Sequence, residues 1–337
     1  MTGAGRPGPV PAAGGQPGHP DGYERLNRYT RIIVDEALRR DIGVRVLDPG
    51  RGELTLSRDG RDVTTIESLS ELTSAVAFRR CDHKLHTRQV LERAGLRLPA
   101  GRAATFGGDD HEFLARWKDI VVKPARGEGG QGISVGVVDG EGLARALEAA
   151  RAVWFEVLLE ERSAGQDLRI VVIGDEVVAA SVRRPPAVEG NGRDTIGSLI
   201  EALSAARSEA TGGASRIPLD AATTGVVEAA GWRLDDVLPE GEVVEVRRTA
   251  NLHTGGTISD VTGELHPHLA TVALEAAAAI GIPVLGLDLM VPDVGGAEYV
   301  IIEANEQPGL ANHEPQPTAE RFLDLLFPDP AGDTASR

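Results

Sequence analysis

Carboxylates near the C-terminus stand at the ends of apolar runs, where they could bind a metal ion. Residues 299–305 are Tyr-Val-Ile-Ile-Glu-Ala-Asn, and Asp288 lies in a second apolar run. Side chains alternate along a strand, so the odd-numbered residues are expected to share one face, with about 7 Å between Glu303 and Asn305. Carboxylate and amide oxygens suit Mg²⁺ when phosphates complete its coordination. The alternative is that Glu303 caps a turn and Asp288 ends a solvated strand.

A glycine-rich loop between two apolar runs could hold phosphate. Lys123 follows the run Ile-Val-Val, and the run Ile-Ser-Val-Gly-Val-Val begins at residue 133. Glycines let backbone N–H groups close around phosphate oxygens, and Lys123 would supply charge. The pattern is not a P-loop, because it has no Gly-Lys-Ser/Thr and a strand follows it. A flexible hairpin tip is the alternative. The loop residues concerned are Gly127, Gly129, Gly130, Gln131 and Gly132.

Lys84 is a second candidate for phosphate binding. The pattern predicts a helix that runs to Ala94, with Asp82 as its N-cap and Gly95 after its end. Lys84 would lie in the first turn, where a cation opposes the helix dipole unless a bound phosphate reverses the sign. The alternative is an ordinary solvated lysine.

Further polar residues occupy predicted strands and loops between these motifs. The predicted strand 153–162 ends in two glutamates, and the strand 167–173 has an aspartate and an arginine on one face. The returning strand 176–182 leads into two adjacent arginines, of which at most one can point into a given site. A polar, glycine-rich stretch at 247–257 suits ligand contact. The candidates are Glu160, Glu161, Ser163, Asp167, Arg169, Arg183, Arg184, Arg248 and Asn251.

Composition limits the classes of protein. The 337 residues are 41% hydrophobic and 26% charged, as in globular proteins of two or three domains. A net charge of −16 disfavours nucleic acid and anionic membranes as partners. A single cysteine fits a reducing compartment, and no apolar run resembles a signal peptide or a membrane span. We therefore expect a cytoplasmic protein whose oligomeric state, including a homo-oligomer, is open.

The elements divide the chain into predicted domains. Residues 1–22 and 329–337 are expected to be tails, the first because it is Gly, Pro and Ala with almost no large apolar group. A helix at 26–40, a strand at 44–47 and a hairpin across 58–61 indicate a small α/β domain over 23–98. A lid subdomain over 99–161 and a catalytic subdomain over 162–328 are expected to follow.

Taken in order, these stretches resemble the ATP-grasp ligases over about residues 70–328. The specificity lies in the ordered series, which is Asp82-x-Lys84, Lys123-Pro with the glycine loop, Glu160, Asp167-x-Arg169, Asp288 and Glu303-x-Asn305. Within that family the stretches 183–192 and 249–257 resemble the cyanophycin-synthetase and glutathione-synthetase branch. The stretches 68–77 and 303–318 look most like the N-acetylglutaminylglutamine synthetases, some of which also carry an acetyltransferase domain.

The resemblance implies an α/β fold in which ATP lies between a glycine-loop lid and a C-terminal mixed sheet, preceded by a small pre-grasp domain. It implies that Lys84, Lys123 and the glycine loop hold the phosphates and that Glu160, Glu161 and Ser163 read adenine. Asp167 would bind the ribose, and Asp288, Glu303 and Asn305 would bind Mg²⁺ or Mn²⁺. The D-alanine ligase pattern has an arginine where this chain has Gly286, so Arg169, Arg183, Arg184 or Arg248 must substitute, with Asn251 as a further substrate contact.

The implied activity is ligation of a carboxylate to an amine through an acyl phosphate, with ATP converted to ADP and phosphate. N-acetylglutaminylglutamine, an osmoprotectant dipeptide, is the expected product, with amino acids or acylated amino acids as substrates. A separate acetyltransferase and amidotransferase would then act in the same pathway. Two alternatives stay open. One is another peptide ligase of the cyanophycin- or glutathione-synthetase type, and the other is a nucleotide-binding regulatory protein without turnover.

Overall fold

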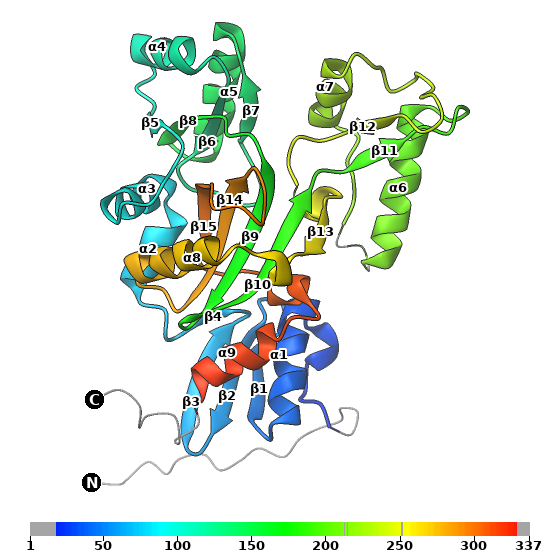
Figure 1. Cartoon of the computed structure of the whole chain (residues 1–337). Coiled ribbons are helices and arrows are strands. Elements are labelled where there is room, and N and C mark those ends of the chain that lie inside the picture. Colours follow the sequence, from blue (N-terminus) through cyan, green and yellow to red (C-terminus); the bar gives the residue numbers. More distant parts are fainter. Residues whose placement is uncertain (1–17, 212, 214, 251, 329–337) are drawn as a thin grey trace. The chain divides into compact units, whose positions relative to one another are not determined.

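The computed structural model describes residues 18–211, 213, 215–250 and 252–328, and these form two compact units (Figure 1). The N-terminal unit joins the residues up to Ser74 with those from Gln307 on, and the central unit is Ala75–Glu306. This division differs from the predicted domains, because residues 75–98 belong to the central unit and the last helix belongs to the N-terminal unit. Most of the predicted tails, 1–17 and 329–337, lies outside the described residues.

A four-stranded antiparallel sheet forms the N-terminal unit, in the order β1 (Gly43–Asp48), β2 (Glu53–Arg58), β3 (Arg61–Ile66) and β4 (Leu69–Ser70). The predicted hairpin is confirmed: Arg58 pairs with Arg61, and the two residues between them have the positive φ of a type I′ turn.

Two helices supply apolar side chains to the core of this unit. They are α1 (Arg28–Arg39) and α9 (Thr318–Leu326), and they contact each other. Ile33 and Phe322 are fully buried, as are Leu54 and Leu56 of β2. Short 3-10 turns, η1 (Tyr23–Arg25) and η4 (Leu310–His313), lie in the same unit. Residues 18–22 of the predicted tail are among the described residues, and the His19 ring stacks on Tyr23 with 4.0 Å between centroids.

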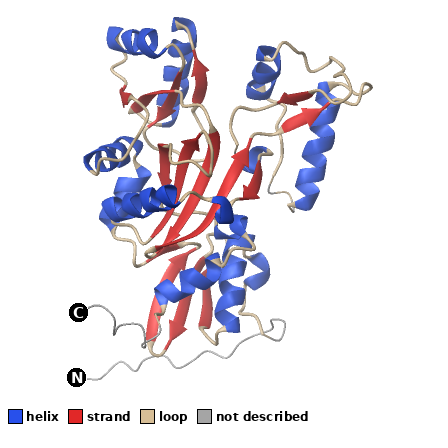
Figure 2. Cartoon of the chain, in the orientation of Figure 1, coloured by secondary structure: helices blue, strands red, loops and turns tan. Residues whose placement is uncertain are grey.

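The central unit is built on a five-stranded antiparallel sheet. Its order is β13 (Thr257–Asp260), β10 (Glu176–Arg184), β9 (Gln166–Ile173), β14 (Val284–Val291) and β15 (Val300–Asn305). Helix α8 (Pro267–Ile280) contacts β9, β10 and β14 and covers one face (Figure 2). Helices α2 (Ala75–Asp82) and α3 (Lys84–Arg93) contact β15, and η3 (Thr262–Glu264) follows β13. Alternate strand residues, such as Leu168 and Ile170, enter this core and leave the opposite face for polar groups.

A second sheet, which we call the lid sheet, precedes these strands in the sequence. Its order is β5 (Gly101–Ala103), β8 (Val157–Glu161), β6 (Ile120–Pro124) and β7 (Ser134–Val137). Helices α4 (Gly108–Trp117) and α5 (Gly140–Val153) pack on it around Ile120, Val122 and Leu143.

A third part of the central unit is inserted between β10 and β13. It contains β11 (Ala187–Glu189), α6 (Ile196–Ala210), α7 (Ala221–Ala229) and β12 (Val243–Glu245), with η2 (Leu252–Thr254) after it. Ile196, Ile200 and Val227 lie in its separate core.

Strand β15 contains a bulge that corrects the predicted face. Asp288 pairs with Glu303 and Leu289 pairs with Ile301, so Ile302 is the extra residue. Ile301 consequently enters the hydrophobic core of the central unit, whereas Glu303 lies opposite Asp288 on the polar face. The prediction that Ile301 and Glu303 share a face is wrong, because alternation does not hold across a bulge.

Candidate functional site

Four charged side chains form a cluster on the polar face of the central sheet. Asp288 on β14 pairs in register with Arg169 on β9, and Arg183 on β10 pairs with Asp167. Arg169 makes a forked contact with Asp288 through Nε and Nη2, the latter at 2.9 Å. Arg183 Nη2 lies 2.7 Å from Asp167 Oδ1 and 2.9 Å from Asp288 Oδ2. Arg169 and Arg183 therefore neutralise Asp288 together.

The electrostatics of this cluster separate its two carboxylates. Burial is the largest influence on Asp288 and raises its pKa, but the charges of Arg169 and Arg183 outweigh it and lower the pKa to about 2. For Asp167, burial raises the pKa, and Arg183 only partly opposes that effect. Asp288 is thus a firmly ionised carboxylate in a largely buried position.

Glu303 and Asn305 extend the same face onto β15. Lys84 Nζ lies 2.8 Å from Glu303 Oε1 and also donates to the Gly127 carbonyl at 3.2 Å. Asn305 pairs in register with Gly286 and donates to its carbonyl at 3.4 Å.

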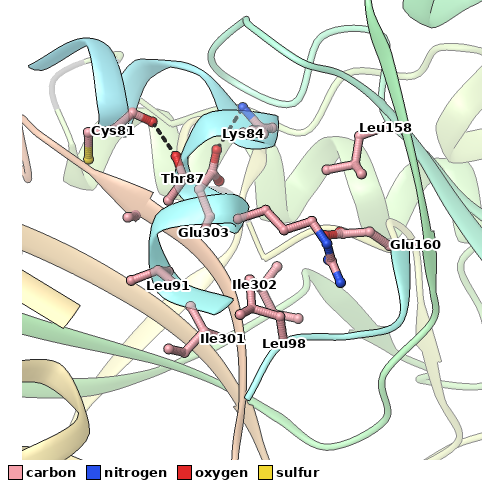
Figure 3. A pocket seen from close by; sticks show the side chains of 12 residues that line it. Cys81, Lys84, Thr87, Leu91, Leu98, Leu158, Glu160, Ile301, Ile302 and Glu303 are labelled. Carbon is pink, nitrogen blue, oxygen red and sulfur yellow. Dashed lines mark hydrogen bonds and ion pairs between the residues drawn. The ribbon is translucent and has the colours of Figure 1, made fainter. Parts of the chain in front are cut away.

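A small cavity of about 20 Å³ lies between α3, β8 and β15, and Lys84, Glu160 and Glu303 contribute to its lining (Figure 3). Lys123 Nζ lies 2.5 Å from Glu160 Oε2 and donates to the carbonyl of the bulge residue Ile302 at 3.3 Å. The ammonium groups of both predicted phosphate lysines thus contact β15. Lys84 binds the side chain of Glu303, and Lys123 binds the backbone carbonyl of Ile302.

Arg88 lies in the wall of this cavity and was not predicted. Its Nη1 lies 3.1 Å from Glu160 Oε1, and the side chain is buried. One signal could have found it, because Arg88 is four residues after Lys84 and therefore on the same side of α3.

The predicted cap of α3 is wrong. Asp82 ends α2 and forms an ion pair with Arg126, while His83 occupies the N-cap position without a capping hydrogen bond from its side chain. The chain bends between two helices here, so a local capping pattern did not reveal the break.

The glycine loop joins β6 to β7. Gly129, Gly130 and Gly132 have positive φ values of 64°, 79° and 69°, which glycine adopts without strain. A Cβ on Gly132 would lie 2.9 Å from Val153 and 3.0 Å from the Ala149 carbonyl, so the loop lies close to the end of α5. Gln131 between these glycines is exposed.

The remaining candidates lie around this centre. Arg184 donates to Ser259 at 3.1 Å, away from the contacts of Arg183, which confirms that the two arginines face opposite ways. Arg248 is exposed, and its guanidinium lies beside Gly136 of β7. Glu161 and Ser163 are partly buried at the end of β8 and just after it. Asn251 lies outside the described residues.

The donor set fits a hard divalent cation. Asp288 and Glu303 are direct cross-strand neighbours, and Asn305 adds an amide oxygen on the same face. Among the described residues no group of three or more His, Cys, Asp and Glu side chains has the arrangement of a metal site. Two carboxylates with an amide suit a Mg²⁺ ion that completes its coordination with phosphate.

Solved structures identify the architecture. A bifunctional glutathione synthetase from Pasteurella multocida superposes with a TM-score of 0.63 at 23% identity, covering 91% of this chain and 44% of that one. The chain has the ATP-grasp fold. The D-alanine–D-alanine ligase from Bacillus anthracis superposes with a TM-score of 0.50 at 15% identity over 75% of this chain and 68% of that one. Residues 81–203 match the family described as the RimK-like ATP-grasp domain.

Curated relatives are similar over most of this chain. Cyanophycin synthetase from Trichormus variabilis is 34% identical over 319 residues, which are 90% of this chain and 35% of that protein. The bifunctional glutathione biosynthesis protein GshAB of Clostridium perfringens is 29% identical over 327 residues, which are 91% of this chain and 42% of that protein. The chain therefore spans well under half the length of these relatives.

Within the described residues, no helix is long and apolar enough to span a membrane.

Proposed function

We infer that the chain is an ATP-dependent ligase that joins a carboxylate to an amine through an acyl phosphate. The observation that carries this inference is the pairing of Asp288 with Glu303 on a face reached by Lys84. Lys123 contacts the same strand from the lid sheet. Cations beside paired carboxylates suit a magnesium–nucleotide complex, because phosphoryl transfer depends chiefly on positioning and charge stabilisation.

The residues have distinct roles in this proposal. Lys84, Lys123 and the backbone N–H groups of the glycine loop bind the phosphates. Glu161 and Ser163 read adenine, because both carboxylate oxygens of Glu160, the third predicted adenine contact, already bind Lys123 and Arg88. Asp288, Glu303 and Asn305 would hold Mg²⁺, which lowers the repulsion between the phosphates and an incoming carboxylate. Arg169 and Arg183 would orient that carboxylate through Nη1, because their Nε and Nη2 atoms already bind Asp288 and Asp167.

The reaction proceeds in two displacements. A carboxylate oxygen of the acid attacks the γ-phosphorus, the bond from that phosphorus to the bridging oxygen breaks, and ADP leaves. The amine nitrogen then attacks the acyl carbon, loses a proton and expels phosphate, which carries away one oxygen of the original carboxylate. The products are an amide, ADP and phosphate.

The proposed substrates are amino acids or acylated amino acids, with N-acetylglutamine as the acid and glutamine as the amine. This finer assignment rests on the stretches 68–77 and 303–318. A different peptide ligase is the second candidate, favoured by the similarity to cyanophycin synthetase and to the glutathione biosynthesis proteins.

The first test separates a ligase from a nucleotide-binding regulator. Purified protein is incubated with Mg²⁺–ATP and pairs of amino acids, and release of ADP is measured together with product mass. A carboxylate labelled with ¹⁸O should pass one label to phosphate. Formation of AMP and pyrophosphate would contradict the acyl phosphate, and the absence of ADP release with every pair would contradict the ligase. Turnover with other pairs only would remove N-acetylglutaminylglutamine as the product.

A variant links that activity to the site. We expect Glu303→Ala to abolish ligation with ordinary Mg²⁺ while leaving the fold intact, because it removes one of the two paired carboxylates. Glu298→Ala is the matched control, since Glu298 is exposed shortly before the same strand. Full activity of Glu303→Ala would show that Glu303 is not a required metal ligand.

A further inference from the structure

Glu160 is a buried carboxylate with a cation on each oxygen. Lys123 Nζ lies 2.5 Å from Oε2, and Arg88 Nη1 lies 3.1 Å from Oε1. All three side chains are at most 9% exposed. Among the described residues these are the cations within ion-pair distance of Glu160. Glu160 is therefore compensated by two cations, one on each carboxylate oxygen.

Arg88 has further contacts besides its ion pair with Glu160. Its Nη2 donates to the Pro99 carbonyl, and its Nε lies 2.9 Å from Glu92 Oε1. Gly101 leaves room for the pair, because a Cβ there would lie 2.8 Å from Arg88 Nη1 and 2.9 Å from Glu160 Cγ. Arg88 is thus fixed by contacts that do not involve the phosphate site.

Lys123, unlike Arg88, is assigned to a phosphate by the proposed function. When its ammonium group binds that phosphate, it moves away from Glu160. A buried carboxylate that loses its only cation is strongly destabilised, since little solvent is available to replace the partner. Because Arg88 stays paired with Glu160, the carboxylate keeps one cation when Lys123 moves to a phosphate.

We propose that Arg88 is a positioning residue that keeps Glu160 compensated while nucleotide phosphate takes Lys123. Arg88 acts through Glu160 and does not touch the nucleotide. The inference rests on the proposed function, because it takes Lys123 as a phosphate ligand. It assigns Arg88 to phosphate affinity and not to recognition of the adenine.

Calorimetric binding of ADP and of adenosine to the full chain tests this assignment. We expect Arg88→Met to weaken ADP binding by about 10- to 100-fold, because Lys123 becomes the sole partner of Glu160. Adenosine binding should change less than threefold, since adenosine leaves Lys123 in place. Arg88→Lys should recover most of the ADP affinity. Arg93→Met, an exposed arginine on the same helix, should match the wild type for both ligands.

A double variant distinguishes this role from simple support of the fold. Glu160→Gln removes the carboxylate that needs compensation, so Arg88→Met should cost little ADP affinity in a Glu160→Gln background. An equal loss of ADP and adenosine binding, or the same loss in both backgrounds, would overturn the proposal, as would unchanged ADP binding in Arg88→Met. If the wild type bound neither ligand, the proposed function itself would fail and this inference with it.

Discussion

Replacement of Asp288 by asparagine should destabilise the central unit in the absence of metal and nucleotide. The substitution keeps the size of the side chain but removes the charge that Arg169 and Arg183 share. Asp288 is 7% exposed, so solvent screens the uncompensated arginines weakly. Removal of one partner from a buried ion pair costs about 3 to 5 kcal/mol. Because Asp167 still binds Arg183, we expect a loss near the lower value, about 3 kcal/mol.

The effect should depend on pH with a defined sign. The pKa of Asp288 is lowered from 3.8 to about 2, so its ionised form stabilises the folded state. Each pH unit between these two pKa values is worth about 1.4 kcal/mol, so the shift contributes about 2 to 3 kcal/mol to the stability at neutral pH. This contribution is complete above pH 4 and is lost as the pH falls towards 2. The difference in stability between the wild type and Asp288→Asn should therefore narrow in that interval.

Urea unfolding followed by tryptophan fluorescence measures this difference in the relevant part of the chain. Trp117, Trp154 and Trp232 all belong to the central unit, so the signal is free of the N-terminal unit. Asp175→Asn, in the exposed turn between β9 and β10, is the control, and Arg169→Met combined with Asp288→Asn should restore part of the loss. Equal midpoints for Asp288→Asn and Asp175→Asn at pH 7 would refute the reasoning.

Three further predictions concern other parts of the chain. Lys123→Met should weaken ATP binding by about 10- to 100-fold, as measured by calorimetry. Lys118→Met, at an exposed position, is the control. Equal ATP affinities of the two variants would show that Lys123 does not bind phosphate. Phe322→Ala should destabilise the N-terminal unit by about 3 to 5 kcal/mol, because the ring is fully buried; unchanged hydrogen exchange in β2 would argue against that core. Deletion of residues 1–17, which retains the stack of His19 on Tyr23, should leave the melting temperature unchanged, and a fall of several degrees would show that these residues contribute to stability.

The alternation of side chains was the most reliable guide from sequence to site. Leu168 and Ile170 enter the core, so Asp167 and Arg169 necessarily share the polar face of β9, as predicted. The same reasoning separated Arg183 from Arg184. These inferences succeeded because they depend on the geometry of one strand and not on its neighbours.

Features that depend on strand pairing were not accessible in this way. The bulge at Ile302 depends on how β15 pairs with β14, and no residue type in the run marks it. The contacts of Arg183 with Asp288 and of Arg88 with Glu160 join residues distant in sequence. The placement of α9 in the N-terminal unit was missed for a similar reason, since an amphipathic pattern shows that a helix has a buried face but not which sheet covers it.

The discontinuous N-terminal unit has a consequence for synthesis of the protein. Strands β1 to β4 and helix α1 leave the ribosome early, but α9, which supplies the buried Phe322 and an aspartate that pairs with Arg40, is translated after the whole central unit. The residues of β1 to β4 are therefore made before the central unit but complete their core after it. During elongation the apolar surface that α9 later covers stays accessible to water and to chaperones, so ribosome-bound chains stalled before residue 318 should bind a hydrophobic dye that released, full-length chains do not.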